Sequence, residues 1–243
     1  MGRVIVYIDW FNVYHSMDDK FGKKYNWLNY KKLSEKFLES GDEIVNIKYF
    51  TAIYDPTIWN WKFNKKKSNK DIDRERKHKL YIQALKTQWV ETILWQYQRV
   101  KKNFSSANDI LEIFPPHVKN FLQKYMKSET TFKDKFNITY YTLEEKKTDV
   151  NIAVDIVSDV FLDLYDKAIL ITWDNDISPA ISTVKENMSK EFTVVFPFWW
   201  KWKSLKKVCD KICYLAESHL QDSQFPDKFV DWTTVFQRPE DWK

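Results

Sequence analysis

The segment Arg-Val-Ile-Val-Tyr-Ile-Asp, residues 3–9, decides the fold class. A short apolar run that ends in an acid is typical of a strand buried inside a parallel sheet. The segment Ala-Ile-Leu-Ile-Thr-Trp-Asp, residues 168–174, repeats this pattern far along the chain. Between and beyond these runs, strand-like and helix-like segments alternate. We therefore expect an α/β sandwich with a mostly parallel central sheet.

Hydrophobic periodicity and capping residues predict the remaining elements. Strands are predicted at 3–9, 43–54, 89–100, 136–143, 167–172 and 192–196, and helices at 29–40, 71–86, 115–127, 148–165 and 179–187. The helix at 148–165 is expected to bury Val150, Val154, Val157, Phe161 and Leu164. Neither a repeat nor a low-complexity linker interrupts the chain, and its tail, 225–243, is expected to wrap the body as a loop.

Composition narrows the functional classes. The chain has 243 residues, 39 Lys+Arg against 34 Asp+Glu, and only three glycines. Three glycines cannot form a glycine-rich phosphate loop, which argues against Rossmann dinucleotide binders, P-loop NTPases and protein kinases. Cys209 and Cys213 are expected to be reduced core thiols because no second pair completes a zinc site. No apolar window is long enough for a membrane span or a signal segment, so a cytoplasmic protein is expected.

Four aspartates form the candidate site. Asp9 and Asp174 end two apolar strands, Asp176 follows two residues later, and Asp149 lies in the first turn of a predicted helix. Ligands of parallel sheets bind beyond the carboxyl ends of the strands, where these acids are expected to meet. Clustered carboxylates repel one another unless a hard cation lies among them, so Mg²⁺ or Mn²⁺ is the expected partner. Taken singly, each acid also fits a helix cap or a turn.

Two further stretches suit nucleic acid. Residues 62–79 hold nine basic and three acidic residues, a net +6, and include Lys65, Lys66 and Lys67. Such a run is either a solvated helix start or a surface for a polyanion. Residues 196–203 interleave aromatic rings with lysines, and these rings either stack on single-stranded bases or pack beneath the tail.

Three motifs resemble one known family. Ile-Asp-Trp-Phe-Asn at 8–12, the stretch 145–155 and the stretch 170–179 are similar, in this order, to the motifs of the NYN domains. These LabA-like domains belong to the PIN-like nuclease superfamily. The likeness runs from about residue 3 to residue 196. Trp10, Lys147 and Trp173 stand where the family motifs commonly have glycine, but no acid is lost.

The resemblance implies a PIN-like three-layer α/β/α fold over residues 1–215, with a helical insertion near 104–135 and a tail, 216–243, packed on the domain. It implies metal-dependent cleavage of RNA, with one or two Mg²⁺ or Mn²⁺ ions held by the four aspartates. Asn12 would orient a ligand water or the phosphate, Lys146 and Thr172 would lie beside the scissile phosphate, and Trp10 and Trp173 would narrow the cleft or stack on bases. Asp155 also matches a family acid, but it is rotated away from Asp149 on the helix and is interpreted as structural or supporting.

Three other readings stay open beside an endoribonuclease of this kind. The fold could serve a catalytically weak RNA-binding or regulatory module, although clustered carboxylates facing a polyanion argue against it. A DNA-cleaving relative would need added helical elements that this length barely accommodates. A metal-dependent phosphatase would want a second Asp where Phe11 stands. Unpaired bases can stack on exposed rings, so single-stranded RNA or the loop of a structured RNA is the expected substrate. The oligomeric state is not predicted.

Overall fold

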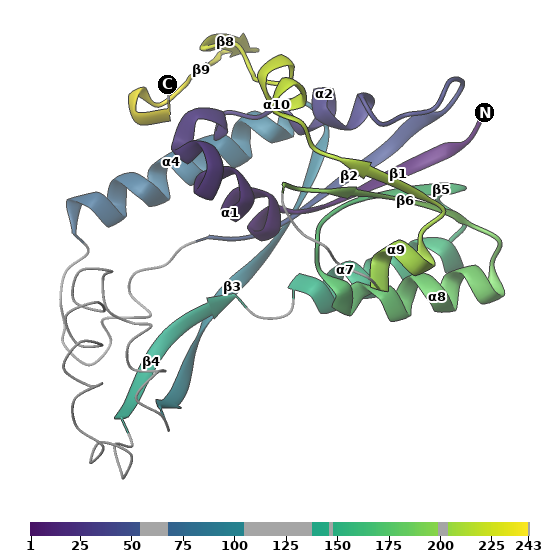
Figure 1. The fold of residues 1–243 in the computed structure, drawn as a ribbon. Helices are drawn as coiled ribbons and strands as arrows, with labels where there is room; N and C mark the ends of the chain where they lie inside the picture. The colour runs from purple at the N-terminus through teal and green to yellow at the C-terminus, as the bar shows by residue number, and fades with distance from the viewer. Residues whose placement is uncertain (54–67, 105–137, 146–147, 199–203, 243) are drawn as a thin grey trace.

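A seven-stranded sheet forms the centre of the protein. The computed structural model describes residues 1–53, 68–104, 138–145, 148–198 and 204–242 (Figure 1). The strand order is β4-β3-β2-β1-β5-β6-β7, in which every neighbouring pair is parallel except the antiparallel pair β3 and β4. The strands are β1 (Arg3–Asp9), β2 (Glu43–Ile53), β3 (Val90–Phe104), β4 (Ile138–Glu145), β5 (Lys167–Ile171), β6 (Glu191–Phe196) and β7 (Lys211–Tyr214).

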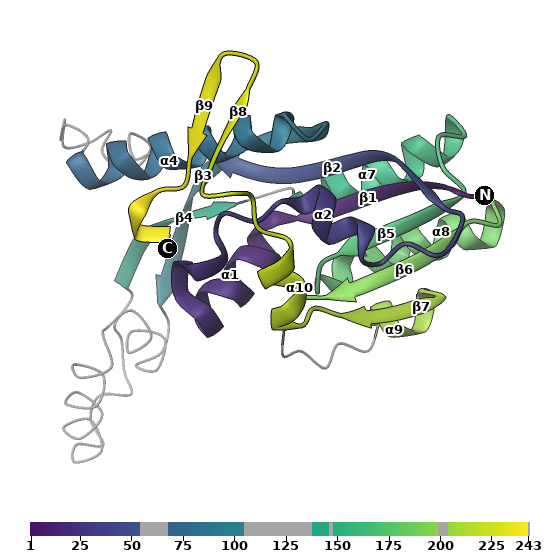
Figure 2. The same cartoon turned by 90° about the horizontal axis from the view of Figure 1, so that it is seen from above.

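Helices cover both faces of this sheet (Figures 1 and 2). One layer holds α1 (Trp10–Phe21), α2 (Tyr30–Glu35), α4 (Asn69–Lys86) and α10 (Glu217–Asp222). The other layer holds α7 (Thr148–Phe161), α8 (Ser178–Asn187) and α9 (Ser204–Val208). Each layer packs its own hydrophobic core against the sheet. The predicted three-layer sandwich with a mostly parallel sheet is confirmed. In the described part of the chain, no helix has both the length and the apolar character that a bilayer crossing requires.

Strand order places the site between β1 and β5. From β1 the sheet grows through β2 and β3 on one side and through β5, β6 and β7 on the other. The crevice beyond the strand ends opens where the order reverses in this way, and such points bind ligands in α/β sheets. Ile8 pairs with Ile171. The residues that follow them, Asp9 and Thr172, therefore leave the sheet as neighbours.

Helix α1, at Trp10–Phe21, was not among the predicted helices. Asp9 ends β1 and also caps this helix, because its side chain accepts a hydrogen bond from the Asn12 backbone N–H. Gly22 ends the helix with a φ of 58°, which glycine adopts without strain. The next helix, α2, begins after its cap Asn29 but ends at Glu35, short of the predicted residue 40.

The predicted buried face of α7 is wrong. Val150 and Val154 are 55% and 53% exposed, and Phe161 is 72% exposed, whereas Ile152 and Ile156 are buried. Eight of the fourteen residues of the helix are apolar, and they form two competing stripes that differ by about half a turn. Packing against the sheet selected the stripe that continues to Val160. The helix also ends at Phe161 and not at residue 165.

The C-terminal tail forms regular structure where a loop was predicted. It contains the hairpin of β8 (Lys228–Asp231) and β9 (Thr234–Gln237), followed by the short helix η4 (Glu240–Trp242). Trp27 is the centre of this packing and contacts Phe225, Phe229 and Trp242 at ring-centroid distances of 5.6, 6.4 and 6.2 Å. The tail therefore completes the core on the face of the sheet that α1, α2 and α4 cover.

The other predicted elements agree with the structure to within a few residues, and the predicted helix at 115–127 lies outside the described residues. Five further short elements were not predicted: α9, β7 and α10, and the 3-10 helices η1 (Gly22–Tyr25) and η3 (Asn175–Ile177). Cys209 and Cys213 are free thiols, as expected. Burial raises the pKa of the Cys209 thiol to about 12, which keeps it protonated and unreactive at neutral pH.

Candidate functional site

The buried carboxylate of Asp9 is the centre of a polar cluster at the ends of β1 and β5. Asp9 Oδ1 accepts the Asn12 backbone N–H at 3.2 Å, and Oδ2 accepts the Thr172 hydroxyl at 3.0 Å and the Asn12 side-chain amide. The same amide also reaches Thr172 Oγ1 at 3.0 Å. All three residues are buried. The cluster locks Asp9 in one orientation and connects the first predicted motif to the third.

The third motif continues from this cluster toward the other acids. The Asp174 backbone N–H donates to Thr172 Oγ1 at 3.0 Å, and Asp174 in turn accepts the Asp176 backbone N–H at 3.0 Å. Burial raises the pKa of the Asp174 carboxyl, and the negative charges of Asp176 and Asp149 raise it as well. Helix α7 packs against η3, so Asp149, Asp174 and Asp176 come from neighbouring segments on the side of the sheet where α7 lies.

These residues fit a hard divalent cation in donor chemistry, but they do not form a ready cage. Carboxylate oxygens are the ligands that Mg²⁺ and Mn²⁺ prefer, and the repulsion at Asp174 is what a cation would relieve. In the described part of the chain, however, no group of three or more His, Cys, Asp or Glu side chains is arranged to hold a metal ion. Asp9 is already engaged by Asn12 and Thr172. Binding of a cation would therefore require the acids to turn toward it.

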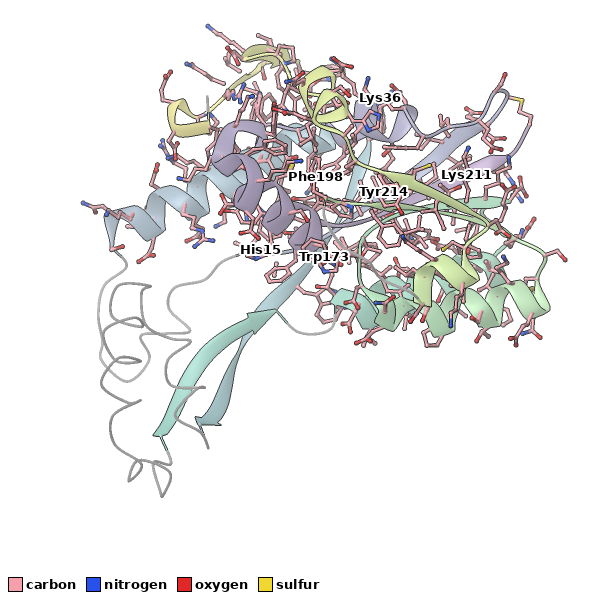
Figure 3. All side chains as sticks on the ribbon, in the orientation of Figure 1. His15, Lys36, Trp173, Phe198, Lys211 and Tyr214 are labelled. Atoms are coloured by element: carbon pink, nitrogen blue, oxygen red, sulfur yellow. The ribbon has the colours of Figure 1, made fainter. Side chains whose placement is uncertain are left out.

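The two predicted tryptophans flank this edge from opposite faces of the sheet. Trp10 packs against the core beneath α1 and α4, whereas Trp173 packs against the core beneath α7 and α8. Figure 3 labels Trp173 below α1, on the α7 side. Trp10 also stacks on Tyr14 and His78. The two rings are half-buried and pack into separate cores, so they do not form one continuous stacking surface.

Several predicted contacts fall outside the described residues. These are Lys146, Lys65, Lys66 and Lys67, together with the tryptophans at 199, 200 and 202. Phe198 is described and is buried in the same core as Phe225 and Phe236 of the tail, which favours the packing interpretation for this ring. Within α4, the basic residues Arg76, Lys77 and Lys79 pair with acids on the same helix, so part of the basic run is an ion-paired helix surface.

Asp155 serves a structural ion pair, in agreement with its interpretation. Lys48 on β2 donates to Asp155 Oδ2 and Asp159 Oδ1, both at 2.9 Å. The Tyr7 hydroxyl donates to the other oxygen of Asp159 at 2.7 Å. Burial lowers the pKa of Lys48, but the two carboxylates outweigh burial and raise it overall. This buried network fastens α7, and with it Asp149, to the sheet.

A cavity next to Asp9 was missed from the sequence. It has a volume of about 490 Å³ and is lined by residues of α1, α4 and η4, among them Trp10, Tyr14, Arg74, His78 and Asp241. A sequence signal for part of it exists, because Asp9 caps the start of α1 and Gly22 caps its end. A helix over this range places Trp10 and Tyr14 one turn apart, on the same face. Residues of α4 and of the tail carry no local signal that they meet there.

Comparison with known proteins agrees with the motifs. The model of the NYN domain matches residues 92–216, just over half of the chain, and this range contains Asp149, Thr172, Asp174 and Asp176 but not Asp9 or Asn12. The match thus begins later and ends later than the likeness read from the motifs.

No curated protein matches the chain. A crystal structure of a protein of unknown function from Vibrio parahaemolyticus is similar, with 15% identity over 89% of this chain and 94% of that chain and a TM-score of 0.49. The matched range and the three-layer fold lead to one conclusion: the chain belongs to the NYN domain family, a family of PIN-like nucleases.

Proposed function

We propose that this protein is a metal-dependent endoribonuclease, and that Asp9, Asp149, Asp174 and Asp176 hold one or two Mg²⁺ or Mn²⁺ ions. Family membership supports a nuclease that acts on nucleic acid. A divalent ion in such a site supplies a bound water of lowered pKa and charge stabilisation at the phosphate. Single-stranded RNA, or the loop of a structured RNA, is the proposed substrate.

One observation carries the proposal more than any other. The carboxyl group of Asp174 is half-buried at the end of β5, and its pKa is raised by burial and by the charges of Asp176 and Asp149. Such a cluster costs stability in a free protein. A function that requires negative charge at this point accounts for acids on neighbouring segments beside the point where the strand order reverses.

The other residues have positioning roles in this proposal. Asn12 and Thr172 hold the Asp9 carboxylate at the strand ends through the contacts described above. The buried pair of Lys48 with Asp155 and Asp159 keeps α7 and Asp149 in register with the strand ends. Lys146 and the lysines at 65–67 are proposed to contact phosphates of the substrate. We further propose that residues 1–215 form the nuclease domain and that residues 216–243 support it.

The test is cleavage of RNA and DNA oligonucleotides by the purified protein in Mg²⁺, Mn²⁺ or EDTA. RNA cleavage in metal, none in EDTA, and none by Asp174→Asn are expected. Asp227→Asn is the matched control, because it makes the same change on an exposed residue of the tail. Cleavage by Asp174→Asn at the wild-type rate would refute the proposed site. Cleavage of DNA in preference to RNA would identify a DNA-cleaving relative.

A specific observation favours a second candidate, an RNA-binding module without strong catalysis. Both oxygens of Asp9 are already bound within the protein, and no ready metal cluster exists among the described residues. The same experiment separates the two functions. RNA binding that persists in EDTA, without cleavage in either metal, would support the binding module and reject the nuclease.

A further inference from the structure

The cavity beside Asp9 has the size of a small-molecule site. Its volume of about 490 Å³ lies within the range of roughly 300–1,000 Å³ that is usual for ligand sites. It is lined by residues of α1 and α4 and of the C-terminal helix η4. Trp10, the residue after Asp9, lines it. A ligand in the cavity would therefore lie near Asp9, the first of the four proposed catalytic acids.

One wall of the cavity is a stack of aromatic rings. Trp10 stacks on Tyr14 with ring centroids 5.0 Å apart and planes inclined by 29°, and on His78 at 4.8 Å and 22°. Burial lowers the pKa of His78 to about 4, and the charge of Arg74 contributes. The imidazole is therefore neutral at pH 7, and the wall presents three uncharged rings. A flat aromatic ligand suits such a wall.

The charged side chains that line the cavity differ in whether they already have a partner. Asp241 of η4 is exposed and binds Lys23 at 3.0 Å and Lys77 at 2.7 Å, so these lysines are already neutralised. Arg74 and Lys70 lie on the exposed side of α4, and Lys70 forms no ion pair within the described residues. Lys70, with Arg74 one turn further along α4, is therefore the place where a phosphate would bind, while the aromatic wall suits an uncharged ring.

The interior also offers hydrogen-bond acceptors. Asn26 lines the cavity and is buried, and its Oδ1 has no hydrogen-bond partner among the described residues. A buried acceptor without a partner costs free energy that a ligand N–H would recover. Asp18 lines the same cavity and is half-buried. These acceptors favour a ring that carries an amino group over a ring that carries carbonyl oxygens at the same edge.

We propose that this cavity binds one nucleotide of the RNA substrate, with an amino-bearing base against the Tyr14–Trp10–His78 wall and its phosphate at Lys70 and Arg74. The inference rests on the proposed function and deepens it, because it identifies a base-selective subsite near Asp9. In this arrangement the RNA backbone runs from Lys70 and Arg74 on α4 toward the end of β1. Cytosine and adenine meet the acceptors with their amino groups, whereas uracil turns carbonyl oxygens toward them.

The test is equilibrium binding of nucleoside monophosphates to the full chain in EDTA. Binding is measured by tryptophan fluorescence and by calorimetry. CMP and AMP are expected to bind about tenfold more tightly than UMP, which corresponds to about 1.4 kcal/mol. The double variant Lys70→Gln, Arg74→Gln is expected to weaken CMP at least tenfold and to leave cytidine, which lacks the phosphate, unchanged. The matched control is Lys79→Gln, Lys86→Gln, which removes two exposed charges of α4 outside the cavity and should bind like the wild type.

These measurements are independent of cleavage. Absence of binding by every monophosphate at millimolar concentration, or equal CMP binding by the Lys70→Gln, Arg74→Gln variant and the wild type, would overturn the subsite even if RNA is cut. UMP binding as tight as CMP would overturn the base preference. Nucleotide binding without RNA cleavage in metal would leave the subsite standing and reject the proposed nuclease.

Discussion

His78 makes the stability of this protein depend on pH. Its ring stacks on Trp10, its Nε2 lies 3.4 Å from Thr51 Oγ1, and burial together with Arg74 lowers its pKa from 6.5 to about 4. An unfolded chain takes up a proton at this residue as the pH falls through about 6.5, whereas the folded protein takes it up only near 4. The stabilising contribution is therefore complete above pH 6.5 and is lost as the pH falls from 6.5 to 4.

The gap between the two pKa values sets the size of the effect. A gap of 2.5 at about 1.4 kcal/mol per pH unit corresponds to roughly 3 kcal/mol of unfolding free energy. We expect His78→Phe, which keeps a stacking ring but does not titrate, to escape this loss. The assay is urea unfolding of both proteins at several pH values between 7 and 4. The free-energy difference between them should change by about 3 kcal/mol in favour of the variant as the pH falls.

The difference in unfolding free energy between the two proteins cancels the contribution of the other titrating groups. The carboxylates and the remaining histidines are common to both proteins. His219→Phe is the matched control. Burial also lowers the pKa of His219, but less strongly than that of His78, so its difference from the wild type should change less with pH. A difference between wild type and His78→Phe that stays constant from pH 7 to pH 4 would refute the assignment of a buried neutral imidazole to this position.

Three further predictions follow from other parts of the structure. Lys48→Met should destabilise the protein by about 3–5 kcal/mol, because it leaves Asp155 and Asp159 without their cation. A fall in melting temperature of only a degree or two would contradict this prediction. Replacing Lys65, Lys66 and Lys67 together by Gln should weaken RNA binding evenly across sequences and flatten its salt dependence by up to about 2–3 units of slope, so an unchanged slope would identify a solvated surface. Trp173→Ala should raise KM for single-stranded RNA more than it lowers kcat, with a moderate loss of thermal stability because the ring is half-buried, and equal cleavage of single strands and duplexes by the wild type would argue against base stacking.

Local sequence was sufficient for the strand ends that form the site. The runs before Asp9 and Asp174 are too apolar for a surface and end in acids, so their place in a buried parallel sheet followed from composition alone. The acid at 149 could be placed in the first turn of a helix for a similar reason, since helix starts have recognisable residues. Helical geometry predicted that Asp155 and Asp149 point in different directions from the helix and have different roles. The ion pair of Asp155 with Lys48 agrees with that prediction.

Other features could not be read from the chain because they depend on which surfaces meet. The apolar residues of α7 form two possible stripes, and only contact with the sheet selected the one that contains Ile152 and Ile156. Trp10 and Trp173 both follow strand ends, but the direction in which each chain leaves the sheet decided that they face different cores. Periodicity says how residues are spaced along an element and not which neighbour will cover them.

By itself, the sequence determined the fold class, the position of the acids at strand ends and the family likeness, because strand burial and motif spacing are local properties of the chain. Only the tertiary structure decided that Asn12 and Thr172, 160 positions apart, hold Asp9 between them. It also brought together α1, α4 and η4 around one cavity. Contacts of this range depend on strand order and on the packing of the tail, which no local pattern encodes.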